Sequence, residues 1–228
     1  MLRLDNPGTA SRPAPSAVLH DTKAVAVLRA KHASDYAPVI EALQRGGVLS
    51  IELTLSTPGV WDELPLLRER FGDSVEIGVG TVTEASEAET ALDLGAAYIV
   101  TPVTDTGVIS LCVDRGVPVY PGGLTPTELH TGWKQGATAV KVFPASTVGA
   151  GYVAQLRGPF PDIELIPSGG VNIVDVPAWI KAGALAVSLG GPLMGDAFRG
   201  GDLDALTARA RRVRGLIDQA VEQLAVPR

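Results

Sequence analysis

Eight short apolar segments recur along this chain at nearly even intervals, and seven of them follow a helical stretch that ends in glycine. Glycine readily adopts the left-handed conformation that ends a helix. Counted from Gly47, the seven glycines lie 25, 23, 21, 20, 22 and 25 residues apart, which is the length of one short strand–helix unit. The strands predicted in this way cover residues 24–28, 48–55, 75–79, 96–100, 117–120, 138–143, 163–166 and 184–189.

Strands that alternate with helices predict an α/β fold built on a parallel sheet. A final helix over about residues 203–224 completes the eighth unit. Eight even units in a chain of 228 residues favour a single (β/α)₈ TIM barrel over residues 21–228. An open Rossmann-type sheet is the alternative, but its G-x-G-x-x-G motif is absent after the first strand, where the chain reads Leu28-Arg29-Ala30-Lys31.

Composition narrows the classes of partner and compartment. The net charge is −6 without a concentrated basic stripe, which argues against a nucleic-acid partner, and no apolar run approaches the roughly 20 residues that span a membrane. The single cysteine, Cys112, cannot form an internal disulfide, and this favours a reducing cytoplasm. Residues 1–20 lack the apolar core of a signal peptide, and we expect a poorly ordered lead-in there.

A carboxylate is predicted inside the barrel on the second strand. Because strand residues alternate between two faces, the aliphatic residues of segment 50–55 contact the helices and turn Ser50, Glu52 and Thr54 inward. An inward carboxylate is costly to bury unless it is paired or protonated. Glu52 is therefore either a functional group or one member of a structural ion pair.

The same alternation turns Lys141 and Phe143 inward on the sixth strand. Catalytic groups of such barrels lie at the carboxyl ends of the strands, where Lys141 is found. Burial disfavours a charged ammonium group, and the neutral amine is the form that attacks a ketone. We therefore expect Lys141 to be a Schiff-base nucleophile; a buried lysine that pairs with a carboxylate is the structural alternative.

Several strand ends offer groups that bind anions. Arg29 ends the first strand and is suited to a bidentate contact with a carboxylate, although a salt bridge to Glu52 or to a loop acid is equally open. Thr81 adds a hydroxyl after the third strand. Backbone N–H groups after strands seven and eight commonly bind phosphate in barrels. Here those loops contain Ser168, Gly169, Gly170, Gly190 and Gly191, although glycine pairs also occur in ordinary tight turns.

Metal-dependent and serine-hydrolase chemistry find little support. His20, His32 and His130 are scattered along the chain without a metal-binding spacing. No G-x-S-x-G motif is present. We therefore expect no metal.

Taken together and in order, these segments resemble the class I aldolases that act on 2-keto-3-deoxy-6-phosphogluconate (KDPG) and 4-hydroxy-2-oxoglutarate (KHG). The resemblance covers about residues 24–224. It is carried by VAVLRA (25–30), GGVLSIELTLSTP (46–58), GVGTVT (78–83), YIVTP (98–102), PGGLTPTEL (121–129), VKVFPAS (140–146), PSGGV (167–171) and SLGGPL (188–193).

The resemblance implies roles for the inward residues. Lys141 would form the Schiff base and Glu52 would be the general acid/base. Arg29 and Thr81 would hold the pyruvate carboxylate, and the pocket would be lined by Pro102 and Phe143. The resemblance also implies a small-molecule 2-keto acid substrate and a homotrimer without metal or cofactor.

Two positions depart from the pattern of many relatives. Ser56 stands where many carry arginine, so Arg29 is expected to take over the carboxylate. Pro192 stands where relatives often have serine in the loop after the eighth strand. Since proline donates no hydrogen bond, the phosphate site is expected to be weakened.

Three alternatives remain open from the sequence. The first is the same chemistry on the galactonate-derived epimer, which differs at C4 of the substrate. The second is a phosphosugar isomerase or epimerase, which shares the barrel and phosphate loops but needs no imine lysine. The third is a barrel that binds sugar acids without catalysis.

Overall fold

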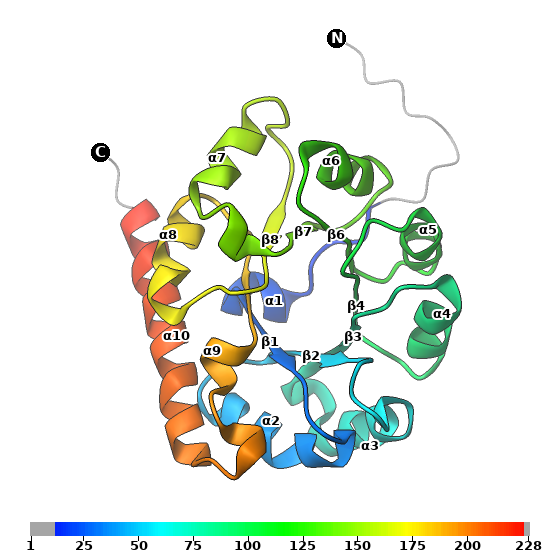
Figure 1. Cartoon of the computed structure of the whole chain (residues 1–228), viewed down its shortest axis with the longest axis vertical. Coiled ribbons are helices and arrows are strands. Elements are labelled where there is room, and N and C mark those ends of the chain that lie inside the picture. The colour runs from blue at the N-terminus through cyan, green and yellow to red at the C-terminus, as the bar shows by residue number, and fades with distance from the viewer. Residues whose placement is uncertain (1–11, 226–228) are drawn as a thin grey trace.

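Within residues 12–225, which the computed structural model describes, nine short strands form a curled parallel sheet that helices surround (Figure 1). Each of the eight predicted strands overlaps an observed one. The strands are β1 (Ala24–Leu28), β2 (Ser50–Thr54), β3 (Glu76–Gly80), β4 (Ile99–Val100), β5 (Val119–Tyr120), β6 (Gly122–Gly123), β7 (Val140–Val142), β8 (Leu165–Pro167) and β9 (Val187–Leu189).

The helices follow the strands as the repeating pattern predicts. The α-helices are α1 (Ala17–Thr22), α2 (Tyr36–Arg45), α3 (Val60–Phe71), α4 (Ala85–Asp93), α5 (Thr106–Asp114), α6 (Pro126–Lys134), α7 (Gly151–Arg157), α8 (Val176–Lys181), α9 (Gly191–Met194) and α10 (Leu203–Ala225). Short 3₁₀ turns are η1 (Ala33–Asp35), η2 (Gly72–Ser74), η3 (Ala145–Thr147), η4 (Ile173–Asp175) and η5 (Ala197–Arg199).

The sheet consists of two hydrogen-bonded sections. Six strands pair in the order β5-β4-β3-β2-β1-β9, and three pair in the order β6-β7-β8. The sections adjoin at Pro121, which separates β5 from β6 because proline has no N–H to contribute to a ladder. The predicted strand 117–120 is therefore continued by a second short piece beyond that proline.

Side chains inside the curled sheet form a layer distinct from the layer between strands and helices. Val140 and Val142 are fully buried in the outer layer, as the alternation predicts. The inner layer contains Tyr98, Tyr120 and Ile166. Six of the seven helix-ending glycines have positive φ, but Gly158 is the exception, with φ −54°. There the chain continues in a right-handed turn after α7, so the predicted left-handed end is wrong at this one position.

The N-terminal part of the described chain packs against the rest of the molecule. The predicted lead-in, residues 1–20, includes most of α1, which begins after an N-cap hydrogen bond from the Leu19 N–H to Ser16 Oγ. Leu19 is fully buried in the inner apolar layer, so α1 covers the amino ends of the strands. Residues 1–11 lie outside the described residues.

Two further features bear on the composition. Cys112 is fully buried in α5. Across residues 12–225, none of the helices combines the length and the apolar character needed to cross a lipid bilayer.

Candidate functional site

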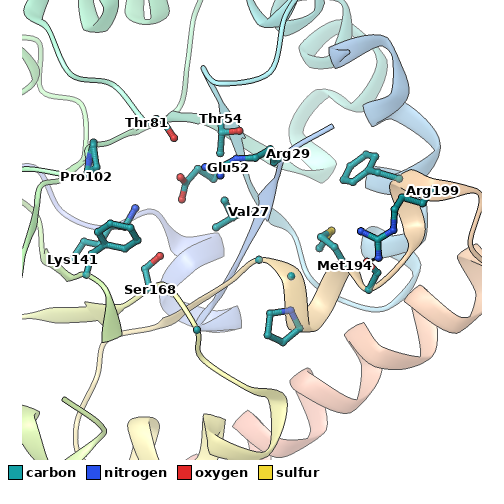
Figure 2. A pocket seen from close by; sticks show the side chains of 18 residues that line it. Val27, Arg29, Glu52, Thr54, Thr81, Pro102, Lys141, Ser168, Met194 and Arg199 are labelled. Carbon is teal, nitrogen blue, oxygen red and sulfur yellow. Dashed lines mark hydrogen bonds between the residues drawn. The ribbon is translucent and has the colours of Figure 1, made fainter. Parts of the chain in front are cut away.

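A cavity of about 540 Å³ opens at the carboxyl ends of the strands (Figure 2). All eleven site residues predicted from the sequence line it, although they come from seven different strands and the loops that follow them. The loops of parallel strands meet at this edge, and this brings together residues more than 100 positions apart. The predicted residues are Arg29, Glu52, Thr81, Pro102, Lys141, Phe143, Ser168, Gly169, Gly170, Gly190 and Gly191.

Lys141 lies in the centre of β7 with its amine inside the cavity (Figure 2). Only 7% of the residue is exposed, and Nζ lies 5.0 Å from the centre of the Phe143 ring. In the described part of the chain, no carboxylate oxygen lies within 4.0 Å of this amine. The structural alternative of a buried lysine in a close ion pair therefore does not describe this site.

Glu52 projects from β2 into the same part of the cavity (Figure 2). It is 1% exposed, and its Oε2 has no hydrogen-bond partner among the described residues. Burial raises the pKa of the Glu52 carboxyl above its ordinary value, and the positive charges of Lys141 and Arg29 offset part of that shift. Burial thus favours the protonated carboxyl group, and the two cations favour the ionised one. A group that can exist in both forms suits general acid/base catalysis.

The sequence of β3 makes room for this carboxyl group. Gly80 lies beside the Glu52 side chain, and a Cβ at this position would overlap the Glu52 carboxyl. A Cβ at Gly78 would likewise overlap the ring of Tyr98, which belongs to the inner apolar layer. The two glycines of β3 therefore leave room for the Glu52 carboxyl group and for the Tyr98 ring.

Arg29 follows β1, and hydrogen bonds hold the chain on both sides of it. The Leu28 carbonyl accepts bonds from Thr54 Oγ1 (2.9 Å) and from the Tyr36 hydroxyl (3.2 Å). The Ala30 N–H donates to Thr57 Oγ1 (3.2 Å). No described carboxylate lies within 4.0 Å of the guanidinium, so the predicted alternative of a salt bridge is not seen there.

Thr81 follows β3 in a left-handed backbone conformation, with φ 62°. This conformation is uncommon for a β-branched residue and costs of order 1–3 kcal/mol. Such strain clusters at functional sites, where the surrounding structure enforces it. No sequence pattern signals it, because only the fold imposes this conformation on a threonine.

The loop after β8 contributes a buried hydroxyl and two glycines. Ser168 is 4% exposed, and its hydroxyl lies 3.2 Å from that of Ser188. Gly169 and Gly170 both have positive φ, so side chains there would be strained. At Gly169 a Cβ would also lie 2.9 Å from the Phe143 ring. This part of the cavity wall therefore exposes backbone rather than side chains.

The sequence did not single out the far wall of the cavity. Arg199 and Phe198 belong to η5, and Met194 ends α9 (Figure 2). These residues follow a loop whose course depends on tertiary contacts, and neither a strand alternation nor a helical period marks them. The remaining lining residues are Val27, Thr54, Pro192 and Gly195. Strand alternation predicts the inward position of Thr54, and Pro192 is one of the two departures from the family pattern.

A metal site needs several ligand side chains close together. No group of three or more His, Cys, Asp or Glu side chains within residues 12–225 is arranged to hold a metal ion.

Comparison with known proteins agrees with this geometry. The family model "KDPG and KHG aldolase" matches residues 16–209. The chain is 32% identical to the 2-dehydro-3-deoxy-6-phosphogalactonate aldolase of Escherichia coli (strain K12) over 186 residues, 81% of this chain and 89% of that one. It is 30% identical to the 2-dehydro-3-deoxy-phosphogluconate aldolase of Haemophilus influenzae, over 69% of this chain and 74% of the relative.

A solved structure is similar in fold. The KDPG aldolase of Legionella pneumophila, with pyruvate captured as a covalent carbinolamine, superposes with a TM-score of 0.80. It is 26% identical, and the match covers 86% of this chain and 96% of that one. The present chain belongs to the KDPG and KHG aldolase family and is an aldolase, a carbon–carbon lyase.

Proposed function

We propose that this aldolase cleaves KDPG to pyruvate and glyceraldehyde 3-phosphate, and KHG to pyruvate and glyoxylate, through a Schiff base on Lys141. The observation that carries the proposal is a buried amine and a buried carboxyl group in one cavity, with no ion pair between them within 4.0 Å. Two groups in a structural ion pair would neutralise each other, whereas here both face space that a substrate can fill.

The reaction begins when the neutral amine of Lys141 attacks the C2 ketone to form a carbinolamine, which takes up a proton and loses water to become a protonated imine. Glu52 takes the proton of the C4 hydroxyl as the C3–C4 bond breaks, and the imine accepts the electron pair as an enamine. The aldehyde leaves. Protonation of the enamine at C3 and hydrolysis of the imine then release pyruvate and regenerate the amine.

Arg29 and Thr81 are the residues we assign to the substrate carboxylate, with Pro102 and Phe143 as walls of the pyruvate site. Both assigned residues line the cavity, and Arg29 has no ion-pair partner within 4.0 Å among the described residues. Ser56 is exposed and is not part of the lining. Arg29 therefore supplies a cation that Ser56 cannot.

For the phosphate we assign the backbone after β8 and β9. Gly169, Gly170, Gly190 and Gly191 line the cavity together with the Ser168 hydroxyl. The competing substrate is the galactonate-derived epimer, which is favoured by 32% identity to a phosphogalactonate aldolase. Parallel assays with both epimers, which differ only at C4, separate these two candidates.

We further propose a closed (β/α)₈ barrel, a homotrimer and a cytoplasmic location. Two backbone hydrogen bonds between the two sections of the sheet support closure: Thr138 N–H to the Val119 carbonyl (3.1 Å) and Leu185 N–H to the Leu165 carbonyl (2.9 Å). The trimer rests on family resemblance, and light scattering is expected to report three times 23.6 kDa. The location rests on the single, buried cysteine.

Borohydride trapping tests the Schiff base. Pyruvate plus borohydride is expected to inactivate the protein and to leave one reduced pyruvyl adduct per chain, on Lys141, by mass spectrometry of peptides. The other four lysines serve as internal controls. An adduct on one of them, or none at all, would contradict the assignment.

A further inference from the structure

We propose that Arg199 binds the distal phosphate of the substrate and thereby sets the preference for phosphorylated over unphosphorylated 2-keto acids. This inference rests on the proposed function, because it assumes that a 2-keto acid occupies the cavity with its reactive carbonyl at Lys141. Arg199 would then be a specificity-determining residue, remote from the bond that breaks.

The charges that line the cavity support a substrate with two anionic ends. Three lining residues are cationic, namely Arg29, Lys141 and Arg199, and one is acidic, Glu52. Lys141 reacts with the carbonyl, and Arg29 is assigned to the carboxylate beside it. Arg199 is thus the one cation of the lining, within the described residues, that the proposed reaction leaves without an anion.

Arg199 lies on the far wall, beyond Met194 from the amine of Lys141 (Figure 2). Its segment is fixed by three contacts: the Arg199 N–H donates to the Asp196 carbonyl (2.7 Å), Nη2 donates to the Gly195 carbonyl (3.1 Å), and the Phe198 ring packs edge-on against Tyr36 at 5.8 Å. The guanidinium is exposed, and no described carboxylate lies within 4.0 Å of it. It is therefore held at the cavity with its charge free for a ligand.

Phosphate is the anion that this arrangement fits best. A guanidinium has five N–H donors in a planar fork that matches phosphate oxygens. In Arg199, only Nη2 donates to the Gly195 carbonyl. Pro192, which also lines the cavity, provides neither an N–H nor a hydroxyl. A charged side chain at this end compensates for the backbone donor that Pro192 lacks.

The first test compares KDPG with unphosphorylated 2-keto-3-deoxygluconate, which has the same carbon skeleton. Arg199→Gln is expected to lower the ratio of kcat/KM for KDPG to that for the unphosphorylated acid by roughly 10–100-fold, the range for one charge-assisted contact. The loss is expected in KM, because the phosphate is equally bound before and during bond cleavage. Arg199→Lys keeps the positive charge but lacks the planar fork, so its ratio of kcat/KM values should lie between those of the parent and of Arg199→Gln.

Arg212→Gln is the matched control, since this exposed arginine lies on α10 and does not line the cavity. It is expected to leave the ratio unchanged. An unchanged ratio in Arg199→Gln, or an equal fall for both substrates, would overturn the inference.

Titration calorimetry with inorganic phosphate gives a readout that needs no turnover. Arg199→Gln is expected to weaken phosphate binding by a similar factor, and Arg212→Gln to leave it unchanged. If Arg199 governs phosphate affinity but pyruvate and borohydride leave no adduct on Lys141, the proposed function fails and the phosphate site stands. If the adduct forms and neither phosphate binding nor the substrate ratio depends on Arg199, only the inference fails.

Discussion

Glu52 and Glu76 lie on adjacent strands inside the curled sheet, Glu52 toward the carboxyl ends of the strands and Glu76 toward their amino ends. Each has one carboxyl oxygen without a hydrogen-bond partner among the described residues, and burial raises the pKa of both. Glu76 pairs in register with Ser50, two residues before Glu52, and so lies closer to the amino ends of the strands. An unpaired oxygen and a raised pKa therefore do not distinguish them, although Glu52 is fully buried and Glu76 only partly.

The surroundings of the two carboxyl groups differ in kind. Near Glu76, the hydroxyls of Ser16 and Ser50 offset part of the raised pKa. Near Glu52, the offset comes from the cations Lys141 and Arg29, and the carboxyl lines the large cavity. A buried acid becomes a candidate catalyst when a nucleophile and open space accompany it; without them it belongs to the packing.

The largest effect is expected at the nucleophile. Lys141→Arg keeps a positive charge near Glu52 but cannot form an imine, and cleavage of KDPG is expected to fall by about 10⁴-fold or more, as for other removed nucleophiles. Steady-state assays of pyruvate release measure this. Lys181→Arg, an exposed substitution on α8, is the control. Substantial turnover by Lys141→Arg would show that charge alone suffices there.

The two acids themselves should separate next. Glu52→Gln is expected to lower kcat by 10²–10⁴-fold, the usual contribution of a general acid/base, while trapping with pyruvate and borohydride persists. Glu76→Gln is expected to change kcat less than about threefold, because no reacting group lies at the amino end. Equal losses in both variants would remove the distinction between the ends.

The pH profile should sharpen the same contrast. Because the pKa of Glu52 is raised, the acidic limb of kcat/KM is expected above the ordinary range of a carboxyl group. That limb should be absent in Glu52→Gln and retained in Glu76→Gln. Its persistence in Glu52→Gln would assign it to another group.

A smaller effect is expected at the rim of the cavity. Pro192→Ser restores an N–H and a hydroxyl, and one such bond to a charged group contributes about 1.5–3 kcal/mol. The preference for KDPG over KHG in kcat/KM is expected to rise, at most by roughly 10–150-fold. If the preference is unchanged in a variant that still cleaves KHG, Pro192 does not limit the phosphate site.

Local alternation allowed the inner wall of the site to be predicted, but not the outer wall. Glu52 and Lys141 follow from the parity of β2 and β7, because strand geometry fixes which residues share a face. Arg199 does not, because η5 depends on packing and on the end of α9 before it, which Arg209 holds by donating to the carbonyls of Leu193 (2.7 Å) and Met194 (2.9 Å). Such contacts join residues whose sequence carries no period.

The short α1 was absent from the prediction for a related reason. Its six residues are too few to give a periodic signal, and it is held by Leu19 inside the sheet. The family motifs identified the chemistry more firmly than composition did, since each motif coincides with a strand and its following loop. The fold class was predictable because its unit repeats eight times, so an error in one unit changes little.

The smallest expected effect concerns stability, and here the two ends should behave alike. A carboxyl group whose pKa is raised in the folded state holds its proton more tightly there than in the unfolded chain. Its contribution to stability is present below the ordinary carboxyl pKa and is lost as the pH rises through the folded value. Both Glu52→Gln and Glu76→Gln remove this loss. Each variant is expected to be more stable than the parent at pH 8, by on the order of 1 kcal/mol, with the gain vanishing near pH 4.

Urea unfolding at both pH values measures the difference, and exposed Glu222→Gln on α10 is the control. A gain that persists at pH 4 would come from packing rather than from ionisation. Stability lost at pH 8 in Glu76→Gln alone would mean that its ionised carboxylate is needed to hold Ser16 and α1, and the amino end would then depend on charge as the carboxyl end does.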